Sequence, residues 1–513
     1  MTLFAPPRSE SRLGTARAEP FSVPGWLWGL SLTGVAALAF LVRFRLLVQS
    51  GGVLGSDGYD DGVYYAAADA LVHGRVPYRD FLLLQPPGTI LALTPFAWFG
   101  SVRQDSAGVI AARLAFIAVG ALNAVLTARV AGRFGKGSAL LAGVGYAVFL
   151  PAAYSERSTL LEPLGTCALL VSVLLVSGLR RNPRLGMLLA GVAGGLALGM
   201  CIWYVVPVAM IAVFQRRSVL SFGIGAAAAA LMVHGPFLVA SPAALVRQVV
   251  LDQLGRPRVV AHTPVTRMAA VLGAMDLHLP QPWAALLSVH KVGLLLAVAA
   301  VVFGVVACTV RGARLFPLTA AATSVVLLAS PSFFLHYAAL TAPWLILTVS
   351  IGVAKSLSSL RSRRLRLALG VLLLLAVMSV NLRAVQVARP SMPIPVTALR
   401  KAAQQVHGCI TSDDPQILAA LDVLSRDYRL GCAVWPDVTG YTYDRDDARV
   451  QGRVVARMQN ELWQADVTRF LLSGNAVIVH RSATRLGGEA NRMVRAGQVL
   501  AKSGNWTLHA VSR

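Results

Sequence analysis

The sequence predicts a mainly α-helical, polytopic membrane protein with a small α/β domain after its last span. The 513-residue chain is 56% hydrophobic, only 14% charged, and has a mean hydropathy of +0.63. Soluble globular proteins carry about 25% charged residues, so this composition excludes that class. Apolar runs of about 20 residues recur along most of the chain, and each could cross a bilayer core of about 30 Å. A rise in charge after residue 386 indicates a separate C-terminal domain.

About eleven apolar segments qualify as transmembrane spans. They follow a polar N-terminal tail, residues 1–25, and no convincing cleavage site follows the first of them, so we expect an uncleaved first span. The membrane domain, residues 26–386, would contain them all. The predicted spans are residues 26–47, 107–130, 138–155, 160–179, 185–202, 203–215, 218–240, 287–310, 315–331, 336–354 and 366–386.

Basic residues between the spans predict the orientation of the bundle. With a cytoplasmic N-terminus, every basic loop falls on the cytoplasmic face, as the positive-inside rule requires. The external regions are then residues 48–106, 241–286 and 387–513. The short, proline-containing stretch 86–100 becomes a helix at the outer surface or a re-entrant piece. The basic loops are residues 129–137, 180–184, 215–217, 311–314 and 355–366.

Residues 387–513 are expected to form the small extracytoplasmic α/β domain. Strands are predicted at "CITSDD", "AVIVH" and "WTLHAV", and helices at 415–426, 450–464 and 489–504. Cys409 and Cys432 lie in this domain, where a disulfide can persist. Sequence alone does not distinguish a bridge from two free thiols, because it does not give the geometry.

The first external loop carries an acidic pair, Asp60 and Asp61, directly before "GVYYAAADALVHG". The small and apolar residues of this stretch share one helical face, so we expect an amphipathic helix on the outer membrane surface. One interpretation is that the aspartates cap this helix, which is worth about 1 kcal/mol. The other is that carboxylates at the membrane edge take part in chemistry.

Two more groups lie at outward ends of predicted spans. Glu162 begins a span, and an ionisable group at that depth suggests a function. An ion pair between Glu156 and Arg157 that stabilises the preceding turn is an equal alternative. His336 and Tyr337 begin a later span, where such side chains serve as interfacial anchors or join a cluster with the carboxylates.

The second external loop carries arginines within "QLGRPR", at Arg256 and Arg258. Guanidinium groups bind phosphate in a bidentate way, so this loop could hold a phosphorylated lipid, or it could simply be solvated. Acidic stretches at 411–415 and 444–447 look like metal or nucleotide-sugar motifs, but fit a strand-to-helix cap and a solvated turn better. We assign no metal ligands. The net charge of +24 lies mostly in the loops between spans and no nucleic-acid motif occurs, so no nucleic-acid partner is expected.

The order of these motifs resembles the GT-C membrane glycosyltransferases, in particular the branch of protein O-mannosyltransferases and the bacterial transferase that adds aminoarabinose to lipid A. That family has an acidic pair in its first external loop, then a tyrosine and two prolines, matched here by Asp60, Asp61, Tyr64 and Pro86–Pro87. Glu162 in "LLEPL" matches its second acidic position. "QLGRPR" and "FFLHYAALTAPW" resemble variants in actinobacterial members.

The resemblance implies that Asp60 is the catalytic base, with Asp61 and Glu162 as the other acidic site residues. The chain departs from the family at Gln85, where many members place a Lys or His that contacts the donor phosphate. This departure shifts the expected phosphate binding onto Arg256 and the second external loop.

The sequence therefore predicts a membrane glycosyltransferase that moves a sugar from a polyprenyl-phosphate donor to a glycan, lipid or protein acceptor outside the cytoplasmic membrane. Such transfer needs a base for the acceptor proton and cations for the departing phosphate. No cofactor is expected, since the lipid-linked sugar is a substrate, and a divalent metal stays open. The alternatives are a transporter or flippase, which would favour mid-membrane charges and internal repeats, and a non-catalytic scaffold.

Overall fold

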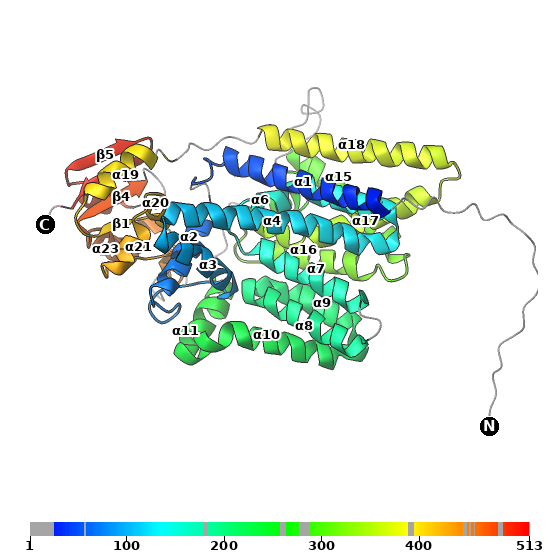
Figure 1. Cartoon of the computed structure of the whole chain (residues 1–513), viewed down its shortest axis with the longest axis horizontal. Helices are drawn as coiled ribbons and strands as arrows, with labels where there is room; N and C mark the ends of the chain where they lie inside the picture. Colours follow the sequence, from blue (N-terminus) through cyan, green and yellow to red (C-terminus); the bar gives the residue numbers. More distant parts are fainter. Residues whose placement is uncertain are drawn as a thin grey trace, which may run out of the picture.

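The computed structural model forms a long helical bundle with a smaller α/β domain against one end (Figure 1). The helices of the bundle run roughly along its long axis, and the C-terminal sheet stacks beyond the ends of α1 and α4. The structure describes residues 25–55, 58–178, 182–256, 263–275, 288–387, 394, 396–444, 449–450, 453–455, 457–480 and 486–511.

A helix overlaps each of the predicted spans, which confirms the helical membrane fold. They are α1 (Gly25–Gln49), α4 (Asp105–Ala131), α5 (Lys136–Val148), α7 (Glu162–Gly178), α8 (Pro183–Met200), α9 (Val205–Phe214), α10 (Val219–Ala240), α15 (Val289–Cys308), α16 (Leu315–Ala329), α17 (Ala342–Ser358) and α18 (Arg363–Val387).

Within the described residues, six helices are long and apolar enough to cross a membrane. They are Gly25–Gln49, Asp105–Phe134, Pro183–Met200, Arg216–Ala240, Val289–Cys308 and Arg363–Gln386. The other predicted spans contain shorter helices, so the count of about eleven spans stays a prediction.

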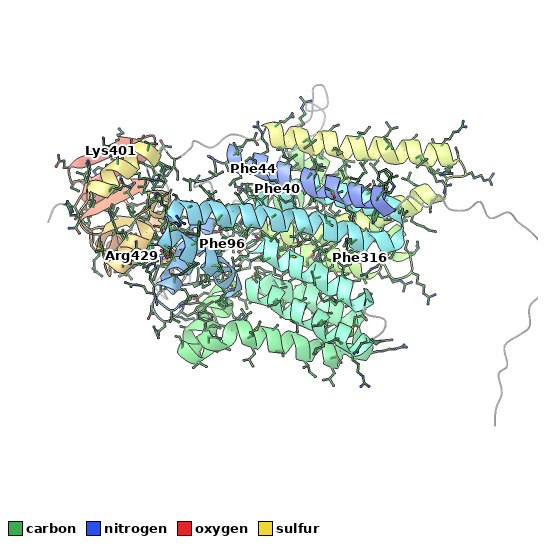
Figure 2. All side chains as sticks on the ribbon, viewed as in Figure 1. Phe40, Phe44, Phe96, Phe316, Lys401 and Arg429 are labelled. Carbon is green, nitrogen blue, oxygen red and sulfur yellow. A yellow bond between two sulfur atoms is a disulfide. The ribbon has the colours of Figure 1, made fainter. Side chains whose placement is uncertain are left out.

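The side chains of the bundle are mostly apolar, as its composition requires (Figure 2). Phe40 and Phe44 stack on α1 with ring centroids 6.3 Å apart, and Phe316 lies within the bundle. Glycines let α8 and α10 approach closely: a Cβ at Gly191 would collide with the backbone carbonyl of Phe222. Small residues serve this purpose in membranes, where helices gain from close packing and not from hydrophobic association.

A buried ion pair ties α1 to the turn before α7. The guanidinium group of Arg43 donates to Glu156 Oε2 at 2.9 and 2.5 Å. Asn123 and Tyr146 donate to the other carboxylate oxygen at 2.7 and 2.9 Å. The partner of Glu156 is therefore Arg43 from the first span, and not Arg157 as in one of the two alternatives left open by the sequence. A buried charge needs such complete pairing to be tolerated.

Two helices between α1 and α4, α2 (Tyr59–Val72) and α3 (Gly88–Val102), lie at the end of the bundle beside the C-terminal domain (Figure 1). The expectation that α2 lies on the membrane surface is wrong. The helix packs against α3 on one side and α20 of the C-terminal domain on another. Ala66, Ala67 and Ala68 are completely buried. Small residues on every face of α2 allow this close approach on all sides.

Short elements connect the longer helices of the bundle. Between α5 and α7 lies α6 (Leu150–Ser155), and the segment between α10 and α15 contains α11 (Pro242–Val246), a π-helical turn at Arg247–Leu251, α12 (Asp252–Leu254) and α13 (Pro264–Val271). A 3-10 helix, η5 (Leu335–Leu340), precedes α17.

The C-terminal domain contains a four-stranded sheet in the order β1-β4-β6-β5. Strand β1 (Ile410–Ser412) pairs in parallel with β4 (Ala476–His480), which pairs antiparallel with β6 (Trp506–Ala510), and β5 (Val499–Ser503) lies at the edge. The other elements are α19 (Val396–Gln405), α20 (Pro415–Ala420), α21 (Leu424–Arg429), α22 (Tyr441–Asp444), the hairpin β2 (Arg449–Val450) and β3 (Arg453–Val454), α23 (Glu461–Leu471) and α24 (Gly488–Val494).

The structure confirms three predicted strands and corrects the helices. The helix predicted at 489–504 ends at Val494, and its second half is β5. Residues 499–503 form a strand because the turn at Gly504, which has a φ of +58°, joins β5 to β6 and lets the two strands pair. The helix predicted at 450–464 is instead hairpin β2–β3 and the start of α23. Cys409 and Cys432 form a disulfide, with Cα atoms 5.6 Å apart.

Candidate active site

A cavity of about 600 Å³ lies where the helical bundle meets the C-terminal domain. From the membrane domain it is lined by residues 58–60, 63–64, 83–85, 154, 157–158, 160, 256 and 333–337, and from the C-terminal domain by residues 414, 437, 439–440, 457 and 480. Most of the sequence-predicted site residues meet here, although they come from segments far apart in the chain. These are Asp60, Tyr64, Gln85, Arg256, His336 and Tyr337.

Asp60 points its carboxylate into this cavity from the first turn of α2. It does not cap the helix, because the N-cap is Gly58 and no side chain bonds there. About 38% of its side chain is exposed, and the residue lines the cavity. Burial, followed by the negative charge of Asp437, raises the pKa of Asp60 to about 7. The opposing charge of Arg256 limits this rise.

Asp61 faces away from the cavity, although it is the next residue. Its side chain is buried and accepts a hydrogen bond of 2.5 Å from Arg113 on α4. Arg113 also donates to the carbonyls of Val53 and Gly55, at 2.7 and 2.8 Å. This ion pair fixes the chain that enters α2. The geometry therefore gives Asp61 an anchoring position behind Asp60.

His336 stands between the two remaining acidic groups. Its Nε2 atom lies 3.9 Å from Asp60 Oδ2 and 3.9 Å from Glu162 Oε1. Glu162 is buried at the start of α7, behind the lining of the cavity, and accepts a hydrogen bond of 2.8 Å from Ser155. The imidazole stacks on Phe334 and meets Tyr337 edge-on, so aromatic contacts fix its orientation.

Arg256 is the arginine of the second external loop that lines the cavity. It is buried and lies 5.9 Å from the ring centroid of Phe334, and its charge acts on Asp60 and Asp437. Arg258 lies outside the described residues. Arg267 holds a different position, since it donates to backbone carbonyls between Leu327 and Pro331 and so supports the segment before His336.

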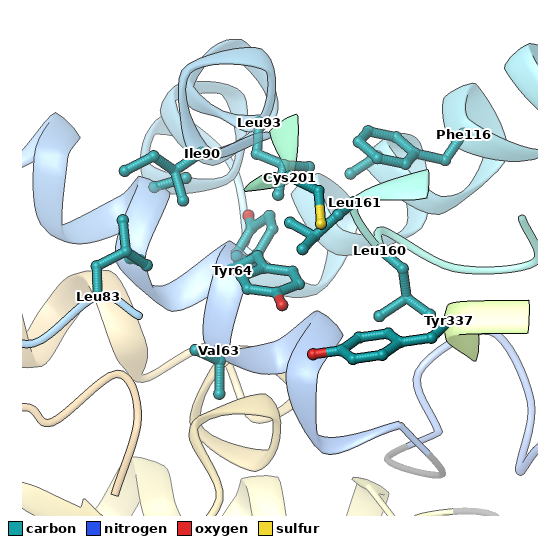
Figure 3. Close-up of a cluster of buried hydrophobic side chains, with 14 of the residues drawn as sticks. Val63, Tyr64, Leu83, Ile90, Leu93, Phe116, Leu160, Leu161, Cys201 and Tyr337 are labelled. Carbon is teal, nitrogen blue, oxygen red and sulfur yellow. The ribbon is translucent and has the colours of Figure 1, made fainter. Parts of the chain in front are cut away.

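Tyr64 and Tyr337 face the same space from different elements. Figure 3 shows Tyr64 on α2 and Tyr337 beside Leu160, with their hydroxyl groups directed toward the same region.

Gln85 reaches the cavity from an extended segment. The Leu83 amide donates to the Gln248 side chain at 3.0 Å, and the Gln253 side chain donates to the Leu84 carbonyl.

Gln85 presents an uncharged group where the family resemblance leads one to expect a cation. Its backbone carbonyl accepts a hydrogen bond of 2.7 Å from the Tyr78 hydroxyl. Its Oε1 atom is buried and has no hydrogen-bond partner in the described part of the chain. The amide is therefore held in the wall with an oxygen that can still accept a hydrogen bond.

The C-terminal domain supplies polar lining that sequence reasoning did not assign to the site, at Asp414, Asp437, Arg457 and His480. Asp414 also caps α20, as predicted, by accepting from the Gln416 amide. Burial raises its pKa to about 8. The only sequence signals at these positions were those of turns and caps, which are common in any polar α/β domain. The motif at 444–447 lies largely outside the described residues.

No group of three or more His, Cys, Asp or Glu side chains suited to a metal ion occurs among the residues that the structure describes.

No known protein-family profile matches the chain, and no curated protein sequence matches it. Several solved structures match the chain. ArnT from Cupriavidus metallidurans bound to undecaprenyl phosphate superposes with a TM-score of 0.60 and 15% identity, covering 96% of this chain and 99% of that chain. The apo oligosaccharyltransferase of Archaeoglobus fulgidus gives a TM-score of 0.52 and 13% identity over 89% of this chain and 70% of that one. The fold is therefore the GT-C membrane fold.

Proposed function

We propose that the chain is a membrane glycosyltransferase, related to the branch that its motifs resemble, which transfers a sugar from a polyprenyl-phosphate donor. The observation that carries this proposal is the shared cavity of Asp60, Arg256 and His336. Sugar transfer from a lipid phosphate requires a base and a cation, and this cavity contains both. The likeness to ArnT bound to undecaprenyl phosphate supports a lipid-phosphate donor.

In the proposed reaction, Asp60 takes the proton of an acceptor hydroxyl. The acceptor oxygen forms a bond to C1 of the sugar as the bond between C1 and the phosphate oxygen breaks. The bonding electrons leave with the phosphate, whose negative charge Arg256 stabilises. His336 lies 3.9 Å from Asp60 and from Glu162, so it helps to set the electrostatic environment of the base.

The place of the cavity suits this chemistry. It lies at the end of the bundle, against the C-terminal domain, so a lipid tail can remain beside the helices while its headgroup enters. We place this end on the outer face of the cytoplasmic membrane and the N-terminus in the cytoplasm, because this orientation puts the basic loops inside. The acceptor is a glycan, lipid or protein that reaches the same face.

The experiment is transfer from a panel of polyprenyl-phosphate sugars by the purified protein, with the Asp60→Asn variant in parallel. Asn keeps the size of Asp60 and removes its basicity, so we expect transfer to fall about 10²-fold or more. Folding should be unchanged, because Asp60 makes no capping bond. The matched control is Asp466→Asn on α23, a carboxylate that pairs with Arg469 away from the cavity.

Two results would contradict the proposal. No transfer from any donor, together with movement of intact lipid-linked sugar across a membrane, would favour the flippase alternative. Wild-type transfer rates in Asp60→Asn would remove Asp60 from the reaction.

A further inference from the structure

The Asp437 carboxylate lines the cavity from the C-terminal domain. The protein holds it through one of its two oxygen atoms. Its Oδ1 atom accepts hydrogen bonds from the Gly440 amide at 2.7 Å, the Tyr59 hydroxyl at 3.2 Å and the Thr439 hydroxyl at 3.3 Å. These three donors come from both domains, so the position of the carboxylate is fixed.

The second oxygen of Asp437 differs from the first. No hydrogen bond to Oδ2 occurs within the described part of the chain, and the residue lines the cavity. Position 440 must be glycine for this arrangement, because a Cβ there would collide with the Asp437 carboxylate. One oxygen is thus anchored and the other remains available to a ligand.

Asp437 is close to both groups that perform the proposed transfer. Tyr59, which donates to Asp437, is the residue before Asp60. Asp437, Asp60 and Arg256 line the same cavity, where the charge of Asp437 acts on Asp60 and the charge of Arg256 acts on Asp437. During transfer, C1 of the sugar lies between the attacking oxygen at the base and the phosphate at the arginine. A group near both of these therefore faces the transferred sugar itself.

We propose that Asp437 is a specificity-determining residue, whose Oδ2 atom accepts a hydrogen bond from a hydroxyl group of the transferred sugar. This inference rests on the proposed function and goes further, since it assigns recognition of the sugar to the C-terminal domain. A site that bonds a substrate hydroxyl discriminates strongly against ligands that lack it.

Binding by the full-length protein in nanodiscs tests this assignment without turnover. The probes are undecaprenyl phosphate and its mannose, glucose, galactose and arabinose conjugates. We expect the wild type to bind at least one conjugate more tightly than undecaprenyl phosphate. Asp437→Asn should weaken the binding of that conjugate roughly 10- to 100-fold, which corresponds to the loss of a hydrogen bond to a charged group. The affinity for undecaprenyl phosphate should be unchanged.

The controls separate sugar recognition from domain contact. Asn at position 437 keeps an oxygen for its three donors, whereas Tyr59→Phe removes one donor and leaves the carboxylate. A selective loss in Asp437→Asn alone supports the inference. It is overturned by an equal loss for both lipids, by the same selective loss in Tyr59→Phe, or by a wild type with no preference for any conjugate. If undecaprenyl phosphate itself does not bind, the proposed function fails first.

Discussion

Asp60 and Asp61 show how neighbouring residues of one type acquire different properties. Helical geometry turns their side chains about 100° apart, so one faces the cavity and the other faces α4. Arg113 pairs with Asp61, whereas the ion-pair partner of Asp60 among the described residues is His336, at the longer distance of 3.9 Å. The sequence identified the pair but not the partner of Asp61, because Arg113 lies 52 residues away from Asp61 in the chain.

The raised pKa of Asp60 predicts the pH dependence of transfer. With a pKa of about 7, the carboxylate is mostly protonated below that pH and cannot act as a base. The rate should therefore rise as pH increases from 6 to 8, with a midpoint at about 7. Initial rates at saturating donor measure this, with intact folding checked at each pH. A rate that stays level from pH 5 to 8 would contradict the assignment.

Site residues of the membrane domain were predictable because charge is rare there. Asp60, Glu162, Arg256 and His336 interrupt or border apolar runs, where an ionisable group stands out. Asp437 was not predictable, because acidic residues are ordinary in a polar α/β domain. Only the fold brings it to Tyr59, 378 residues earlier in the chain.

At the scale of elements, the sequence predicted whether a segment forms a helix or a strand better than it predicted what packs against that segment. The helix at α2 follows from its alanines, but its burial depends on α20, which the local pattern does not contain. Strand β5 was mistaken for a helix because "QVLAKS" continues a helical run, and it pairs with β6 through long-range contacts. Short segments of this kind take their structure from neighbours more than from propensity.

The disulfide gives a prediction for the C-terminal domain. It closes a loop of 23 residues that joins the start of β1 to the end of α21. Replacing both cysteines with serine should destabilise the domain by about 3 kcal/mol, because the unfolded chain regains that loop entropy. Thermal unfolding of the purified protein measures it. Cys308→Ser, which removes a free thiol from α15, is the control, and equal melting of both variants would contradict the prediction.

At the scale of the whole molecule, the orientation in the membrane is a prediction from charge. Helix α4 begins at the C-terminal domain, and α18 leads back to it, so basic loops 129–137 and 355–366 both lie at the far end of the bundle (Figure 1). A reporter fused after Arg361 should report the cytoplasm, and one fused after Gly255 the outside. An external signal at Arg361 would reverse the orientation and move the C-terminal domain inside.

Ser425 of α21 contributes to the contact between the two domains. Its hydroxyl oxygen lies 3.0 Å from Asp69 Oδ1 on α2 and 2.5 Å from Asp105 Oδ1 on α4. One hydroxyl hydrogen can serve only one carboxylate, so the second contact requires a proton on the other carboxyl group. Burial raises the pKa of Asp69, which suits that role. Ser425 thus joins the C-terminal domain to both α2 and α4.

Ser425→Ala should loosen this contact and lower transfer with it. The change removes the hydroxyl donor from two buried carboxylates, and only Asp105 keeps a hydrogen bond from the backbone amide of residue 425; the loss costs about 1–3 kcal/mol. The C-terminal wall of the cavity would then separate more often, so protease cleavage between α18 and α19 should increase and transfer should fall. Ser473→Ala is the matched control, because the Ser473 hydroxyl donates to the Phe470 carbonyl within its own domain. If both variants resist protease and transfer sugar equally, the active site does not depend on this contact.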